Sequence, residues 1–194
     1  MSTIYKILCY NAIMNWKDWN PGLDNDHLTM REVLGSLPGN DPEEISKIVK
    51  FFENPDSPFA FKGAVSLERH DCIHILLGRG LLSQDEAFVI GFTMGTSKAL
   101  SKTELAVFKL LVRYIYPHPY KMTANDLKIY ELAVQRGHEC RVEKIYDFPF
   151  ENYYDETLGD LRKKIGINKD KLSEVYVKEK ELLPNTIPSK RLDV

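Results

Sequence analysis

The sequence predicts an all-α protein, a single-domain helical bundle of about seven helices. Apolar residues recur at helical spacing in several segments, capping residues mark several helix starts, and no segment shows the alternation of a strand. A chain of 194 residues with 43% hydrophobic and 28% charged residues can bury a core as one domain. We therefore expect one domain over residues 1–183 and a mobile C-terminal tail over 184–194.

Three helices are expected in the N-terminal part of the chain. A short helix is expected near residues 3–14, and a second between His27 and Leu37, closed by Pro38-Gly39. The third begins at Asp41-Pro42-Glu43-Glu44, where an N-cap, a proline in the first helical position and a glutamate at N3 coincide. It ends before the prolines at 55 and 58.

Two helices follow, over about 64–77 and 84–95. Gly78 or Gly80 can end the first in a left-handed conformation. Ser83 can start the second as its N-cap. This pair carries the chemically most informative residues of the chain.

The segment from Leu105 to Tyr116 is almost entirely apolar, because its charged residues are only Lys109 and Arg113. Ser101 and Glu104 form a capping-box pattern before it, and Pro117 ends it. Such a helix either lies in the core or rests on a membrane with its cations among the headgroups. We expect the buried position, since a bundle needs a central helix.

Three further segments have helical patterns, which makes nine candidate segments for a bundle of about seven helices. Thr123 and Asp126 start one that runs to about Arg136, with Gly137 as its stop. Another covers about 151–164 and ends at Gly166. The last, over 170–183, is densely charged, and we expect it to be a solvated surface helix.

Composition and charge bear on the possible partners of the protein and on its cellular compartment. A formal net charge of −2 gives no reason to expect a nucleic-acid partner. The three cysteines are far apart, which fits a reducing compartment. The N-terminus has no long apolar run and no arginine before Arg31, so neither a signal nor a transit peptide is expected. With no run of about 18 apolar residues, we expect a cytoplasmic protein, with peripheral contact to the membrane left open.

A candidate metal site lies within the 17 residues from His70 to Glu86, which also contain Asp71 and His74. A helix places the two histidines on one face, and a helical hairpin brings Glu86 towards them. Asp71 is rotated by about 100° from His70, so it either binds the metal or orients an imidazole or a bound water. Imidazoles with carboxylates suit a divalent metal, with zinc as the first expectation and iron, manganese and magnesium as alternatives.

Each of these residues also has a simpler explanation. Histidines four apart on a helix are often a surface pair or hydrogen-bonded core residues. Glu86 can complete a capping box with Ser83. Asp71 can pair with Arg69 or Lys62. Spacing alone leaves these alternatives open, because short motifs often occur by chance.

The motif resembles that of the Coq-four family of ubiquinone (coenzyme Q) biosynthesis, which carries HDxxH, eleven residues and then Glu, as here. Residues 74–78, HILLG, are similar to the family's continuation, and residues 161–167, LRKKIGI, to its closing LRxxLGI. An acidic-aromatic run precedes that closing motif, and an Ala133-xxx-Gly137 step is also shared. The resemblance covers roughly residues 28–168. The chain departs from the family at Asp85, where glycine is usual.

The resemblance implies an all-α protein that binds a divalent metal through His70, Asp71, His74 and Glu86. It also implies a prenylated quinone precursor or other isoprenoid lipid as ligand, a homodimer, peripheral membrane attachment and contact with other quinone-biosynthesis proteins. The implied activity is oxidative decarboxylation and hydroxylation at C1 of a prenylated benzoate head group.

Two alternatives to this enzyme remain. The first is a non-catalytic scaffold that binds prenyl lipids, indicated by the apolar 105–116 segment. The second is an HD-type metal-dependent phosphohydrolase, which would combine His70 and Asp71 with a distant histidine such as His27 and a downstream aspartate. That alternative leaves His74 and Glu86 without a role.

Overall fold

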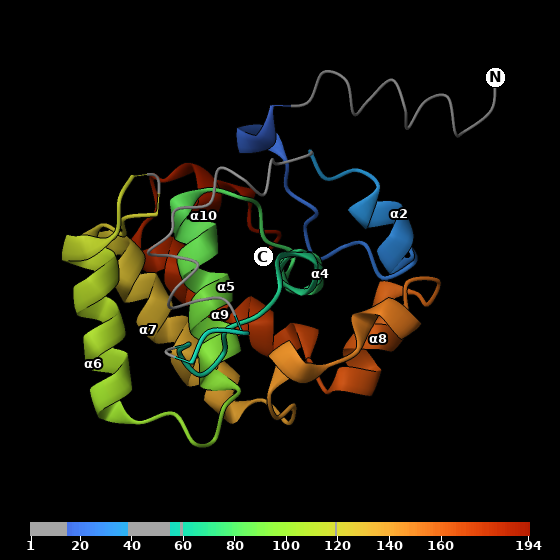
Figure 1. Cartoon of the computed structure of the whole chain (residues 1–194). Coiled ribbons are helices and arrows are strands. Elements are labelled where there is room, and N and C mark those ends of the chain that lie inside the picture. The colour runs from blue at the N-terminus through green and yellow to red at the C-terminus, as the bar shows by residue number, and fades with distance from the viewer. Residues whose placement is uncertain (1–14, 39–54, 59, 119) are drawn as a thin grey trace.

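The structure is a computed structural model that describes residues 15–38, 55–58, 60–118 and 120–194. These residues form eight α-helices and no strand, so the predicted all-α class is confirmed (Figure 1). The helices expected near 3–14 and after Asp41 lie outside the described residues.

The α-helices are, in chain order, α2 (Met30–Leu34), α4 (Leu67–Leu77), α5 (Ser83–Gly95), α6 (Lys102–Leu110), α7 (Ala124–Glu139), α8 (Leu158–Ile165), α9 (Lys169–Leu182) and α10 (Ile187–Arg191). The shorter elements are the 3-10 helices η1 (Trp16–Asp18), η4 (Ile145–Asp147) and η5 (Phe150–Asn152), and the π-helix η3 (Leu111–Ile115), which extends α6. Helix α2 is shorter than the helix expected between His27 and Leu37.

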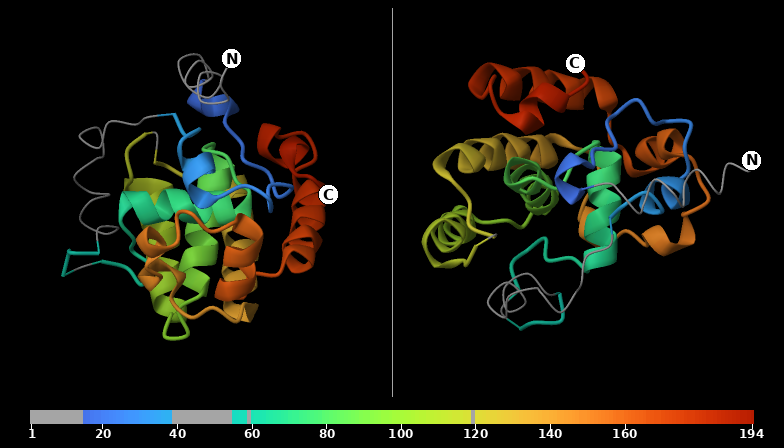
Figure 2. Two further views of the ribbon diagram at one scale, coloured as in Figure 1. Left: turned by 90° about the vertical axis from the view of Figure 1, so that its right-hand side faces the viewer. Right: turned by 90° about the horizontal axis from the view of Figure 1, so that it is seen from above.

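Helix α5 lies at the centre of the molecule, along α7 and crosswise to α4 (Figures 1 and 2). No charged residue follows Glu86 until Lys98, and most side chains between them are buried. The α5–α7 contact is close because glycines face backbone: a Cβ on Gly137 would overlap the carbonyl oxygen of Phe92. The sequence predicts that Gly137 stops its helix, but this prediction is wrong, because α7 continues to Glu139.

The 105–116 segment does not form the central helix, and the expectation of a buried helix is wrong. Helices α6 and η3 lie at the edge of the molecule, with Phe108 and Val112 as their buried residues. Leu105 and Leu111 are partly buried, but four other large apolar side chains are exposed, by 45% at Val107, 56% at Leu110, 69% at Tyr114 and 51% at Ile115. Among the described residues, every helix falls short of the length and apolarity that a membrane span requires.

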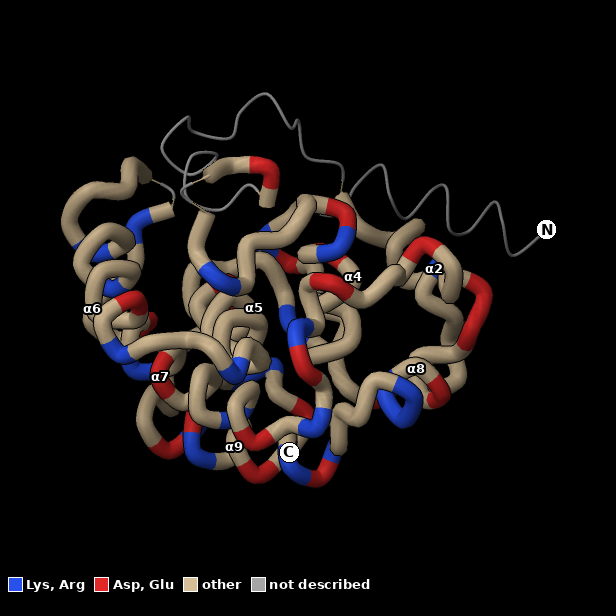
Figure 3. Tube along the Cα trace, turned by 60° about the horizontal axis from the view of Figure 1, so that its bottom comes forward, with Lys and Arg blue, Asp and Glu red and all other residues tan. Residues whose placement is uncertain are grey.

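The C-terminal region is packed on the bundle. The sequence predicts that α9 is a solvated surface helix, but one side of it buries Leu172, Tyr176 and Glu179. Acidic and basic residues both occur along the helix (Figure 3). Residues 184–194, expected to be a mobile tail, contain α10 and bury Ser189 and Leu192.

The motif LRKKIGI holds α4 in place. Arg162 is 2% exposed and donates from Nε to the carbonyl of Leu76 (2.9 Å) and from a terminal nitrogen to that of Ile75 (3.3 Å). Because the last carbonyls of a helix lack partners within it, these bonds stabilise the end of α4. Gly166 ends α8 in a left-handed conformation (φ 87°), as the sequence predicts. The motif thus supports the helix that carries His70 and His74.

Candidate metal centre

The candidate ligands come from two helices joined by a short loop. Helix α4 ends at Gly78, whose left-handed conformation (φ 65°) turns the chain away. The loop over residues 78–82 leads to α5, so His74 lies in the last turn of α4 and Glu86 in the first turn of α5. This is the hairpin arrangement that the sequence spacing indicates.

The side chains of His70, His74 and Glu86 meet. The two Nε2 atoms lie 2.8 Å apart, and they lie 3.1 Å (His70) and 3.3 Å (His74) from the Glu86 carboxylate oxygens. A tetrahedral zinc ion with bonds of about 2.1 Å separates its ligands by about 3.4 Å. A small outward shift of the side chains therefore admits an ion, and this group can hold one.

His74 is held in the tautomer that a metal needs. Its side chain is 1% exposed, compared with 19% for His70 and 35% for Glu86. Its Nδ1 lies 2.8 Å from the carbonyl oxygen of Gly80, which can only accept a hydrogen bond. The proton therefore sits on Nδ1, and Nε2 presents its lone pair to the centre of the group.

Glu86 is an ionised ligand candidate. Burial by itself raises the pKa of its carboxyl, but the interactions with the neighbouring imidazoles of His74 and His70 outweigh this and bring the pKa well below its usual range. Two imidazoles and one carboxylate form the donor set of some catalytic zinc sites and of non-haem iron oxygenases. The residues present therefore fit a divalent transition metal.

Glu86 does not cap its helix, so that simpler explanation is excluded. The N-cap of α5 is Leu82, and its backbone N–H donates to Oδ2 of Asp85 (3.3 Å). The Ser83 hydroxyl, expected to be the cap, donates instead to Asp126 of α7 (2.9 Å). Asp85 therefore occupies the capping role and leaves Glu86 directed towards the imidazoles.

Asp71 does not belong to the group in which the other three residues meet. Burial raises the pKa of its carboxyl, although the neighbouring imidazoles of His70 and His74 act in the opposite direction. It is thus close enough to influence the imidazoles, and its role as a ligand stays a prediction. The two cations considered as its partners form other ion pairs: Arg69 with Glu151 (2.8 Å) and Lys62 with Glu104 (3.3 Å).

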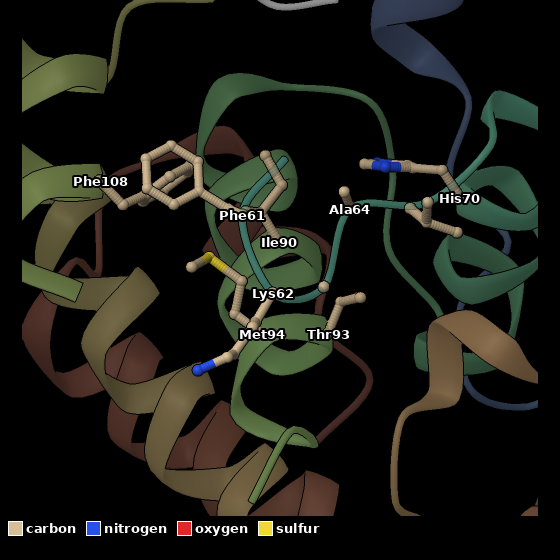
Figure 4. A pocket seen from close by; sticks show the side chains of 10 residues that line it. Phe61, Lys62, Ala64, His70, Ile90, Thr93, Met94 and Phe108 are labelled. Carbon is tan, nitrogen blue, oxygen red and sulfur yellow. The ribbon is translucent and has the colours of Figure 1, made fainter. Parts of the chain in front are cut away.

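A small cavity of about 40 Å³ lies beside His70 (Figure 4). The His70 ring points from α4 towards it, and its other walls are mostly apolar, including Phe61, Ile90, Met94 and Phe108. This volume accommodates about one water molecule, whereas a drug-sized ligand needs at least about 300 Å³. An aromatic substrate therefore requires the cavity to widen.

Sequence reasoning missed two features of the site. One is the hydrogen bond between the Gly80 carbonyl and His74, and the other is the buried partner of Arg79. The one signal in the sequence is that Arg79 is the sole charged residue between His74 and Asp85. A charge within an apolar run is seldom buried without a partner. That partner, Glu179, is 100 residues away and cannot be identified from local spacing.

His27, the distant histidine of the phosphohydrolase alternative, is not part of the metal group. It lines an open groove that also contains Asp160 and Lys169. Comparisons with models of known protein families, with curated proteins and with solved structures each found no match.

Proposed function

We propose that this chain is a metal-dependent enzyme of ubiquinone or prenylquinone biosynthesis, acting in oxidative decarboxylation and hydroxylation at C1 of a prenylated benzoate ring. The observation that carries the proposal is the meeting of His70, His74 and Glu86. Three protein ligands leave a position for substrate or water, as catalytic metal sites require, whereas structural zinc sites use four. The similarity of the motif to the Coq-four family supports the choice of pathway.

The identity of the metal decides which chemistry is available. The proposed reaction releases the ring carboxyl as CO2 and places one oxygen atom of O2 on C1 as a hydroxyl. The other oxygen atom leaves as water, using two electrons and two protons from an external reductant. A redox-active ion would supply oxygen activation there. Zinc has no redox chemistry, so this reaction requires iron or manganese, while zinc would favour a structural or purely Lewis-acid role.

Within this proposal the cavity beside His70 receives the aromatic ring. Its apolar walls suit a ring that carries a prenyl chain, and His70, which would help to hold the metal, is one of the residues that line it. The walls from Phe61 and Phe108 lie towards α6, so the prenyl chain would leave in that direction. Widening requires movement of residues 60–65, which close the cavity on one side.

Elemental analysis of the purified protein, His74→Ala and His27→Ala tests the proposal. Wild type and His27→Ala are expected to contain roughly one equivalent of transition metal, and His74→Ala less than a tenth of that. Iron-loaded protein should then release CO2 from a 3-prenyl-4-hydroxybenzoate with O2 and a reductant. Equal and negligible metal in all three proteins would refute the metal centre. Loss of metal in His27→Ala, with metal retained in His74→Ala, would favour the phosphohydrolase alternative.

A second function, a non-catalytic prenyl-lipid-binding scaffold at a membrane surface, is favoured by the exposed apolar side chains of α6 and η3. We expect wild type to sediment with anionic lipid vesicles and Leu110→Ser/Ile115→Ser to remain in solution. Val177→Ser is the matched control, because Val177 is 45% exposed on α9. A homodimer and contacts with other quinone-biosynthesis proteins belong to this proposal as well. Vesicle binding without turnover would favour the scaffold over the enzyme.

A further inference from the structure

A buried ion cluster adjoins the loop that joins the two helices carrying the candidate ligands. Arg79, in the loop between α4 and α5, is 0% exposed. One terminal nitrogen donates to Glu179 at 3.0 Å and to Asp85 at 3.4 Å, and the other donates to the second oxygen of Glu179. The guanidinium also lies over the rings of Phe88 (3.9 Å) and Tyr176 (4.4 Å). Two carboxylates thus share one cation in the core.

This cluster connects the metal hairpin to the C-terminal helices. Glu179 of α9 also accepts from Gln84 of α5 (2.6 Å), and Gln84 donates to Ser189 of α10 (2.9 Å). The Tyr176 hydroxyl donates to the carbonyl of Leu77, the last residue of α4. The end of α4, the loop and the start of α5 are therefore all fastened to α9 and α10.

The same cluster adjoins both helices that carry ligands. Arg79 precedes Gly80, whose carbonyl holds Nδ1 of His74. Gly80 has little room, since a Cβ there would lie 2.7 Å from the carbonyl oxygen of Trp19 and 3.2 Å from Asp85. Asp85 directly precedes Glu86 and accepts from the backbone of the loop. Displacing Arg79 would therefore move the support of His74 and the first turn of α5 together.

Stability alone is a weak explanation for this arrangement. Removing charges from water is costly, and buried ion pairs are often no more stable than apolar residues of similar volume. A two-point arginine–carboxylate pair does, however, define a geometry more strictly than an apolar contact. Directional contacts of this kind are suited to holding a metal site.

We propose that Arg79 and Glu179 are positioning residues of the metal centre, and that their pairing fixes the 78–82 loop on α9 so that His74 and Glu86 meet at metal-binding separation. The proposal rests on the metal centre proposed above. Because coupling is reciprocal, a bound ion in turn tightens the docking of α9 and α10. Glu179 lies beyond the roughly 28–168 region of family resemblance, and Asp85 is a departure from the family.

Cobalt(II) titration of metal-free protein tests this role, because its absorption spectrum reports ligand geometry. The test variant is Arg79→Met/Glu179→Gln, in which the amide introduced on α9 can still accept from Gln84. The control is Arg136→Met/Glu139→Gln, which removes an arginine–glutamate pair (3.3 Å) within α7. We expect the control to match wild type. The test variant should bind cobalt roughly 10–100-fold more weakly, with an altered spectrum.

Hydrogen exchange over residues 169–191 gives a second readout. Cobalt should slow exchange there in wild type and in the control, but not in Arg79→Met/Glu179→Gln. Wild-type affinity and spectrum in that folded variant would overturn the positioning role alone. Should it fail to fold, Glu179→Gln decides in the same way, because it removes one charge and keeps the shape. A wild-type protein that binds no cobalt would overturn the metal centre itself, and the positioning role with it.

Discussion

His74 combines three properties that a metal ligand needs: burial, a fixed tautomer and an ionised carboxylate close by. Its Nδ1 is held by the Gly80 carbonyl (2.8 Å), and Glu86 lies 3.3 Å from its Nε2. Without metal, the short contact between the two imidazoles (2.8 Å) is a hydrogen bond that His70 donates. An ion can bind there only when the proton of His70 sits on Nδ1 and both imidazoles are neutral, so affinity depends on pH.

We predict that cobalt affinity falls as the pH is lowered from about 7 to about 5, because protons compete with the ion for imidazole nitrogens. Glu86 does not limit this range, because the neighbouring imidazoles lower the pKa of its carboxyl and keep it ionised throughout. The check is cobalt absorbance followed during acid titration. A cobalt affinity that does not change over this pH range would contradict imidazole ligation.

Asp85 carries a testable electrostatic cost. Burial raises the pKa of its carboxyl to about 6, although Arg79 and His74 act in the opposite direction. A raised carboxyl pKa means that the folded state binds the proton more tightly, so stability falls as the pH rises from about 4 to 6. Asp85→Asn removes this loss while keeping an acceptor for the backbone of Leu82.

We therefore expect Asp85→Asn to raise the free energy of unfolding of metal-free protein by roughly 1–3 kcal/mol near pH 8, and by almost nothing near pH 4. Urea unfolding at both pH values measures the difference. A gain of equal size at both would show that the charge is not responsible.

Helices α5 and α7 pack closely together, and glycines make this close contact possible. A Cβ at Gly137 would overlap the carbonyl oxygen of Phe92, whereas one at Gly35 has its nearest neighbour at 3.4 Å. We predict that Gly137→Ala lowers stability by about 1–3 kcal/mol through overpacking. Gly35→Ala, the control, should change it by less than about 0.5 kcal/mol. Thermal unfolding of both variants is the measurement. If Gly137→Ala were as stable as Gly35→Ala, the added methyl group would be accommodated without strain between the helices.

Helix α6 shows why an apolar sequence is not enough to place a helix in the core. Phe108 and Val112 pack inwards, while Leu110 and Tyr114 remain more than half exposed. The central position belongs to α5, which has no charge from Ala87 to Ser97 and glycines where α7 approaches. The proposed membrane or lipid contact would use this exposed face of α6.

The whole molecule should respond to the metal, because the two ligand-bearing helices contact both the core and the C-terminal helices. A ligand that binds only the folded state at 100 times its Kd adds about 2.7 kcal/mol. For a chain of this size that corresponds to a rise in Tm of about 5–10 °C. We expect this rise in wild type, its reversal by a chelator, and its absence in His74→Ala. An equal rise in His74→Ala would place the metal elsewhere.

Local sequence patterns predicted the features that depend on neighbouring residues. Thr123 caps α7 with Asp126, Gly78 ends α4 in a left-handed conformation, and Gly166 ends α8 likewise. The meeting of His70 and His74 with Glu86 belongs to this class, because one helical turn and one short loop fix their separation. The all-α class follows from the same local periodicity.

Contacts between distant segments could not be read from such patterns. The central position of α5, the burial of α9, the partner of Ser83 and the Arg79–Glu179 pair each depend on the path of the chain between the segments that meet. That path is set by how apolar faces of several helices fill a common core. Residue type and spacing therefore predicted three side chains that could hold a metal, whereas packing determined what holds them in place.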